Sequence, residues 1–128
     1  MKPSKAGLAV ALASGALRAA PAAWAHHSFA MFDYTKNVTL TGTIKEFQWT
    51  NPHAWVQLLI RDPATGKDIE WSIEGGSPNM LARQGWKKDA LKPGDKASIV
   101  IHPLKSGEMG GSMVSAVVNG VAVGGPGL

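Results

Sequence analysis

The chain has 128 residues, 13 Lys and Arg against 9 Asp and Glu, a formal net charge of +4, and no cysteine. This length fits one domain of ordinary size. The lack of cysteine excludes disulfides, iron–sulfur clusters, thiolate zinc sites and a cysteine nucleophile. Hydrophobic residues make up 45% and charged residues 17% of the chain, so the composition is that of a folded protein and not of a disordered polyelectrolyte.

The first 25 residues have the pattern of a secretory signal peptide. Lys2 and Lys5 precede an apolar run from Leu8 to Leu17, and a small-residue stretch ends at Ala23-Trp24-Ala25, which is typical of an export signal with its cleavage site. The apolar run is about half as long as the roughly 20 residues that span a membrane. The sequence therefore predicts a periplasmic or secreted protein without an integral membrane segment after cleavage. The alternative is an amphipathic or buried N-terminal helix.

The net charge changes when this segment is set aside. Lys2, Lys5 and Arg18 are its charged residues, so residues 26–128 carry ten basic and nine acidic side chains, a net charge of +1. The basic residues are scattered, with Lys87-Lys88 as the one adjacent pair. Nucleic-acid binding needs a clustered basic surface, so no nucleic-acid partner is expected.

Three β-strands are predicted in the first half of the domain. Apolar residues alternate with threonines from Val38 onward, and Gly42 on the apolar face would permit sharp coiling of a small barrel. Residues 54–61 form a more heavily buried second strand. In residues 68–74 the apolar side chains are expected to face inward, and the polar ones, Glu70 and Glu74 included, to face solvent.

The pattern then changes to a short helix followed by two strands. Ser77-Pro78 is a good N-cap with proline at the first helical position, and Gly85 suits the stop, so residues 79–84 make about two turns with Met80 and Leu81 as core contacts. Lys92-Pro93-Gly94-Asp95 has the signature of a type II turn. Strands are expected near 96–102 and 112–118. Glycine and proline then predict a flexible tail over 119–128.

The order of these elements predicts the fold class. Three strands, a helix and two strands over about 85 residues match a mainly β, OB-like Greek-key barrel of about five strands, with one short helix between the third and fourth. An open β-sandwich is the main alternative. The chain is accordingly divided into a signal peptide (1–25), an N-terminal arm (26–37), the barrel (38–118) and the tail (119–128).

All four histidines are candidate metal ligands. Cleavage after Ala25 would give His26 a free α-amine next to its imidazole, with His27 beside it, and nitrogen ligands of this kind favour Cu(II). His53, or His102 with Met109 or Met113, could complete such a copper site. The alternative is that two histidines at a mobile terminus have no specific role.

A second candidate site is the loop that joins the first two strands. Asn51-Pro52-His53 is flanked by Trp49 and Trp55, and proline restricts the loop. An aromatic-walled loop with one titratable group could bind a small ligand through Trp49, Asn51, His53 and Trp55. It could equally be a polar corner of the barrel. The patterns G-x-S-x-G, H-E-x-x-H and Walker A are absent, so no catalytic residue is assigned.

These motifs resemble one family. HHSF at residues 26–29, QWTNPH at 48–53, GSP at 76–78, GW at 85–86, LKPGD at 91–95 and HPL at 102–104 are similar to a family of small exported bacterial proteins catalogued as a domain of unknown function. The resemblance covers essentially the whole chain from His26 onward and implies export and a small β-barrel. It implies no activity, substrate or catalytic residue.

Three classes of function follow. The favoured one is a non-enzymatic module that binds a small ligand or an envelope protein, with Cu(II) binding through His26 and His27 as its specific form. The second is a metalloenzyme, which requires His26, His53 and His102 to converge. The third is a structural module of the cell envelope.

Overall fold

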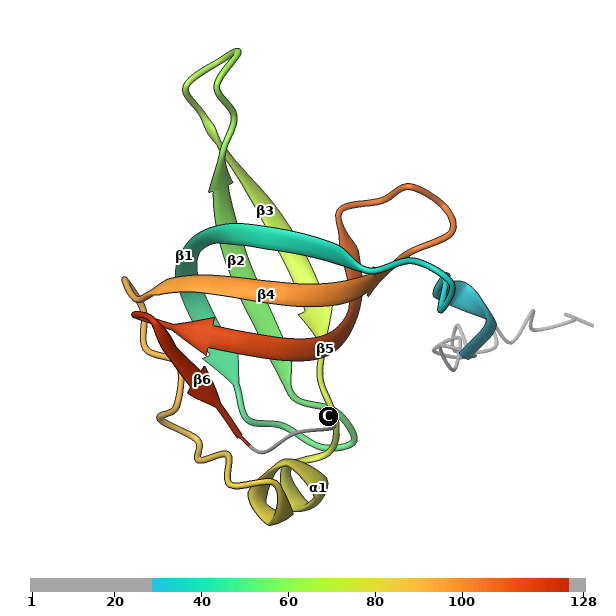
Figure 1. The fold of residues 1–128 in the computed structure, drawn as a ribbon, viewed down its shortest axis with the longest axis vertical. Coiled ribbons are helices and arrows are strands. Elements are labelled where there is room, and N and C mark those ends of the chain that lie inside the picture. The colour runs from blue at the N-terminus through green and yellow to red at the C-terminus, as the bar shows by residue number, and fades with distance from the viewer. Residues whose placement is uncertain (1–28, 125–128) are drawn as a thin grey trace, which may run out of the picture.

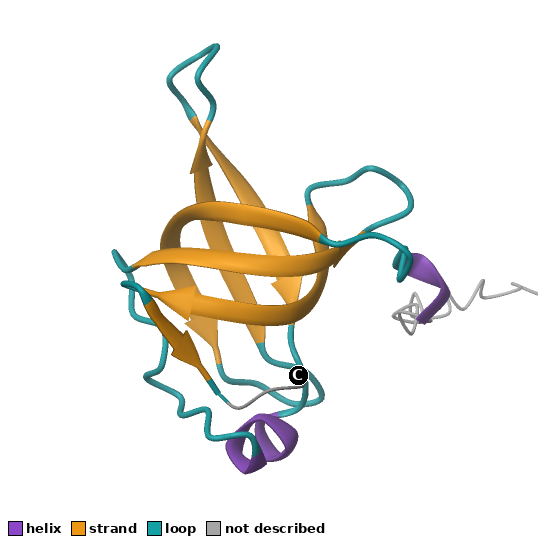
Figure 2. Cartoon of the chain, viewed as in Figure 1, coloured by secondary structure: helices purple, strands orange, loops and turns teal. Residues whose placement is uncertain are grey.

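The computed structural model describes residues 29–124, which form a small closed β-barrel with one short α-helix and a single 3-10 turn, η1, before the first strand (Figure 1). The elements in chain order are η1 (Phe29–Met31), β1 (Val38–Gln48), β2 (Trp55–Arg61), β3 (Asp68–Glu74), α1 (Pro78–Arg83), β4 (Lys96–Pro103), β5 (Gly110–Val118) and β6 (Val121–Val123). Figure 2 shows that strands form the body of the domain and that α1 lies at one end of the barrel. The predicted signal peptide and the histidines at 26 and 27 lie outside the described residues.

The strands close in the order expected of an OB-like barrel. β1 is long enough to pair with β4 along its first half and with β2 along its second half. β3 pairs with β2 in antiparallel register and closes the barrel by a parallel pairing with β5. This closure by β3 and β5 confirms the predicted fold class and excludes the open β-sandwich.

Gly42 allows β1 to bend between its two partners. A Cβ atom at this position would overlap the Leu59 carbonyl oxygen on β2, which leaves no room for any side chain. A register shift between Ile44 and Glu46 adds a bulge a few residues later, and bulges increase the local bend of a strand. The sequence prediction of a coiling glycine is confirmed.

The core fills the barrel and continues under α1. Ser77 caps α1 by accepting a hydrogen bond from the Met80 backbone N–H, and Gly85 ends the helix with a φ of 87°. Leu81 is buried, whereas Met80 is 50% exposed, so the prediction of Met80 as a core contact was wrong. The buried apolar cluster comprises Leu40, Ile44, Ala54, Val56, Leu58, Ile73, Leu81, Trp86, Leu91, Ala97, Ile99, Ile101, Met113, Ala116 and Val118.

β6 was not expected from the sequence. Asn119 and Gly120 both have positive φ, 49° and 83°, and connect β5 to β6 as a two-residue hairpin loop. Asn-Gly is a strong hairpin signal because both central residues of this turn need positive φ. The glycine content of residues 119–128 predicted a flexible tail and concealed this signal.

Candidate functional site

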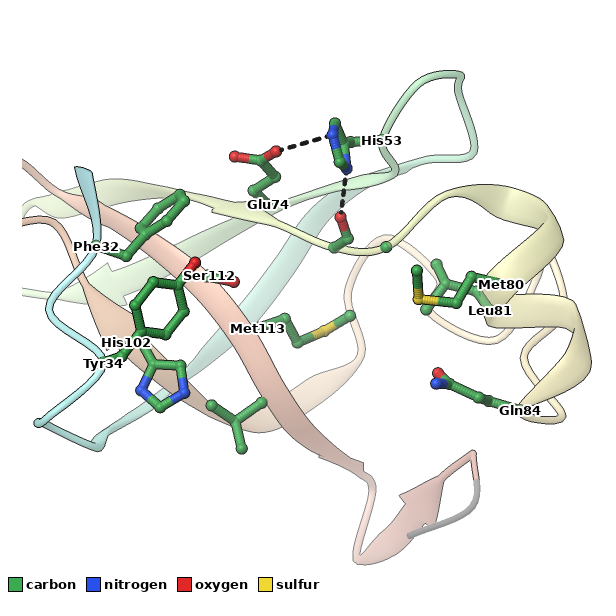
Figure 3. A pocket seen from close by; sticks show the side chains of 13 residues that line it. Phe32, Tyr34, His53, Glu74, Met80, Leu81, Gln84, His102, Ser112 and Met113 are labelled. Carbon is green, nitrogen blue, oxygen red and sulfur yellow. Dashed lines mark hydrogen bonds and ion pairs between the residues drawn. The ribbon is translucent and has the colours of Figure 1, made fainter. Parts of the chain in front are cut away.

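A cavity of about 370 Å³ opens at one end of the barrel. Its wall combines the N-terminal arm, the ends of β3, β4 and β5, and α1 (Figure 3). The lining residues are Phe32, Tyr34, His53, Glu74, Gly75, Gly76, Met80, Leu81, Gln84, His102, Ser112, Met113 and Val114. The cavity therefore lies where segments distant in sequence meet.

The strand register places three polar residues in a row across this wall. Glu74 on β3 pairs with Ser112 on β5, and Ser112 pairs in turn with His102 on β4. Neighbouring strands are about 4.8 Å apart, so about 10 Å separate the backbones of Glu74 and His102. A register shift in β5 leaves Val114 without a pairing partner on β4. Val114 also lines the cavity. Bulges are frequent beside functional sites because they redirect a side chain.

Glu74 is a buried carboxylate with one unused oxygen. The residue is 8% exposed, its Oε1 lies 3.4 Å from His53 Nε2, and its Oε2 has no hydrogen-bond partner. Its position in β3 predicted a solvent-facing side chain, and that prediction was wrong. The end of β3 is enclosed by β5 and by the loop that holds His53, so solvent does not reach the carboxylate as it reaches Glu70, whose side chain is 42% exposed.

The loop between β1 and β2 holds His53 beside Oε1 of this carboxylate. Its Nδ1 lies 3.2 Å from the Gly75 carbonyl oxygen, which can only accept a hydrogen bond, so Nδ1 is the donor and Nε2 faces Glu74. Ala54 fixes the loop by exchanging backbone hydrogen bonds with Gly75 and Gly76, at 2.7 and 2.9 Å. Figure 3 shows His53 turned toward Glu74 at the rim of the cavity.

The N-terminal arm supplies the aromatic part of the wall. Backbone hydrogen bonds join Asp33 to Pro103 and Lys105 to Met31 at 2.8 and 2.9 Å, and Phe32 is 7% exposed. The Tyr34 ring packs edge-on against His102 with 5.0 Å between the ring centroids. The backbone carbonyl of residue 36 accepts a hydrogen bond from His102 Nδ1 at 2.9 Å.

Two consecutive glycines keep the cavity open on the side of α1. A Cβ at Gly75 would lie 3.2 Å from the Met113 methyl group, and one at Gly76 would lie 3.1 Å from the Met80 sulfur. Larger residues would therefore push both methionine side chains. The thioethers and Leu81 give this part of the cavity an apolar surface.

Residues 12–113 match the model of a family of unknown function (DUF6152). The chain belongs to this family. Membership confirms the resemblance seen in the sequence motifs and carries no activity with it. Comparison with curated proteins and with solved structures found no match.

In this family member, two of the four histidines identified from the sequence line the same cavity. His53 and His102 both line it. Across residues 29–124, no three side chains among His, Cys, Asp and Glu converge closely enough to hold a metal ion, and the spacing of the polar row explains why. Any further ligand from His26 or His27 would come from outside the described residues.

The predicted ligand loop contributes to the cavity through His53 alone. Trp49 packs edge-on against Phe47, Asn51 is exposed, and Trp55 is half-buried at the start of β2. None of these three belongs to the cavity lining.

Within residues 29–124, no helix has the length and apolar character needed to cross a membrane.

Four lining residues on which the site argument depends were missed by sequence reasoning: Phe32, Tyr34, Glu74 and Ser112. Tyr34 precedes the first strand, in a segment without periodicity. Ser112 lies at the start of the last predicted strand and gave no motif. The available signal was the topology itself, since an OB-like barrel brings the end of the third strand beside the last strand.

Proposed function

We propose that this protein is an exported module that binds a small ligand in the cavity between the N-terminal arm, β3–β5 and α1. The observation that carries the proposal is Glu74, a buried carboxylate in the cavity wall with one oxygen lacking a donor. Buried polar groups are nearly always paired, and one without a partner calls for a functional explanation. The volume of about 370 Å³ and the mainly apolar wall with a few polar groups suit a small molecule.

A pair of variants on one strand tests whether the cavity is the binding site. Ser112→Phe places a ring in the cavity, whereas Ser115→Phe places the same ring at an exposed position three residues further along β5. Ligand-observed NMR with a panel of small cationic, neutral and anionic compounds should find binding to the wild type and to Ser115→Phe that Ser112→Phe loses. If Ser112→Phe does not fold, Val114→Phe, at another lining position of β5, places the ring in the cavity instead.

The result that overturns the proposal is equally specific. If no compound of the panel binds the wild type, or if Ser112→Phe binds as the wild type does, the cavity is not a ligand site. Recovery of an envelope protein in complex with the chain, together with that result, would favour the structural class.

Export is the second part of the proposal. The basic start, the apolar run and the Ala23-Trp24-Ala25 stretch support cleavage after Ala25 and a periplasmic or secreted location. Expression of the full chain, followed by fractionation and N-terminal sequencing, should yield a product that begins at His26 outside the cytoplasm. A full-length product retained in the cytoplasm would refute this part.

Copper binding is a second candidate function, favoured by the position of the arm. Phe32 is packed into the barrel at the cavity, and His27 precedes it by five residues, a span of at most about 18 Å. His26 and His27 are therefore within reach of His53 or His102. An N-terminal amine with imidazoles offers the nitrogen ligands that Cu(II) prefers.

The test of this candidate compares two N-termini. The processed chain and a version with one additional residue before His26 are titrated with Cu(II). The extra residue removes the α-amine from its place beside the His26 imidazole, so it should weaken binding. Equal affinities would remove the chelate argument, and unchanged binding in His53→Ala and His102→Ala would remove both from the site.

A further inference from the structure

The charge of the cavity wall selects the class of ligand. Among the described residues that line the cavity, Glu74 is the one carboxylate and none is Lys or Arg. His53, the partner of Glu74 Oε1, has a side chain 45% exposed, against 10% for Glu74. Water screens the exposed imidazole far more than the buried carboxylate. The wall at Glu74 therefore has negative character that the solvent-screened His53 offsets only in part.

We infer that the cavity binds a small organic ammonium, a primary amine on an apolar or aromatic body, with the Glu74 carboxylate as its anchor. This inference rests on the proposed function and names its ligand class. An ammonium has three donors and no acceptor, which matches an oxygen that lacks a donor. The row places the Ser112 hydroxyl, a second acceptor, on the strand next to Glu74.

The rest of the wall suits the body of such a ligand. Phe32 and Tyr34 present aromatic rings, 6.2 Å apart, and aromatic faces attract cations. Leu81 and Met113 supply buried apolar surface close by. A ligand carboxylate would instead face Glu74 with like charge, and no lysine or arginine of the lining could offset the repulsion.

Three probes with the same phenylethyl body separate the effect of ligand charge from hydrophobic binding. 2-Phenylethylamine is cationic, 2-phenylethanol is neutral, and 3-phenylpropanoate is anionic at neutral pH. Calorimetric or NMR titration of the full chain, recovered as the cell processes it, should give the tightest binding for the amine. A charge-assisted hydrogen bond in a buried site corresponds to an affinity about ten- to a hundredfold higher than that of the alcohol. The anion should not bind.

Substitutions on β3 assign the preference to one carboxylate. Glu74→Gln keeps the shape of the side chain and should reduce amine affinity by about ten- to a hundredfold, with little change for the alcohol. Glu74→Asp keeps the charge and should retain the preference for the amine. Glu70→Gln, at an exposed position on the same strand, is the matched control and should bind as the wild type does.

The outcomes distinguish this inference from the proposed function. If the alcohol or the anion binds the wild type as tightly as the amine does, the ammonium inference is wrong while the cavity remains a ligand site. The same holds if Glu74→Gln leaves amine binding unchanged. If no probe and no member of the broader panel binds, both the ammonium inference and the proposed ligand-binding function are wrong.

Discussion

Replacing Glu74 by leucine should stabilise the folded protein. The residue is 8% exposed and one of its oxygens has no donor, and a buried polar group without a partner costs about 1–3 kcal/mol of folding free energy. Leucine removes that cost and adds apolar surface beside the core. The substitution also removes the 3.4 Å contact with His53, whose side chain is 45% exposed; even with a protonated imidazole, such pairs contribute about 0–1 kcal/mol. The expected net gain is about 1–2 kcal/mol.

Urea unfolding followed by tryptophan fluorescence and thermal unfolding followed by circular dichroism measure this gain. For a domain of this size, 1 kcal/mol corresponds to about 4–8 °C in Tm, so Glu74→Leu should raise Tm by roughly 4–16 °C. Glu70→Leu is the matched control. Its parent side chain is 42% exposed and pairs with Lys45, so the free energy of unfolding should change by about 0.5 kcal/mol or less.

The opposite sign would refute the reasoning. If Glu74→Leu lowers the free energy of unfolding by more than about 1 kcal/mol, the carboxylate has a donor in the folded protein and is not an unpaired group. That result would also withdraw the main support for an ammonium ligand. A gain in stability with loss of amine binding would instead be the exchange between stability and function that is common at binding sites.

Three further predictions concern the frame of the site. Gly42→Ala should lower the free energy of unfolding in urea by about 3 kcal/mol or more, since its Cβ would meet the Leu59 carbonyl oxygen and backbone cannot move aside as a side chain does; a loss below about 1 kcal/mol would show that β1 is not constrained there. Ser77→Ala should cost about 1 kcal/mol in the same assay because it removes the cap of α1, and an unchanged midpoint would deny the cap that role. Hydrogen bonds from the Thr35 hydroxyl and backbone N–H lower the pKa of Asp33, so its contribution is present above the unfolded-state pKa and disappears as pH falls through the folded-state pKa. Wild type should therefore lose more stability than Asp33→Asn between about pH 5 and pH 2, and parallel losses would contradict the shift.

Much of the barrel could be predicted because it depends on local patterns. Alternation over residues 68–74 predicted β3 with the bounds that the structure has. The serine cap, the proline at the first helical position and Gly85 predicted α1 to within one residue. The role of Gly42 could be predicted because a glycine on the apolar face of a strand indicates that another segment approaches the backbone closely. In the structure that segment is β2, at the Leu59 carbonyl. The order of the elements then indicated the OB-like topology.

The N-terminal arm shows what local patterns do not contain. Residues 29–37 have no periodicity, and their order comes from backbone hydrogen bonds to Pro103 and Lys105, about seventy residues away. Phe32 is buried because the barrel offers it a place beside Leu104. Neither partner can be identified before the barrel is closed, so the aromatic wall of the cavity could not be predicted.

Glu74 shows why a site of this kind escapes a rule based on alternation. The alternation rule assigns each residue of a strand to one of two faces. It takes the polar face to be exposed to solvent along the whole strand. At the last residue of β3 that assumption fails, because β5 joins β3 there in parallel and the His53 loop covers the other side. The Glu74 side chain stays on the polar face that alternation predicts, but the neighbouring segments shield it from solvent. A carboxylate retained at such a position costs stability in the empty barrel, and a donor brought by a ligand would offset that cost. The departure from the alternation rule is thus itself the strongest support for the proposed ligand site.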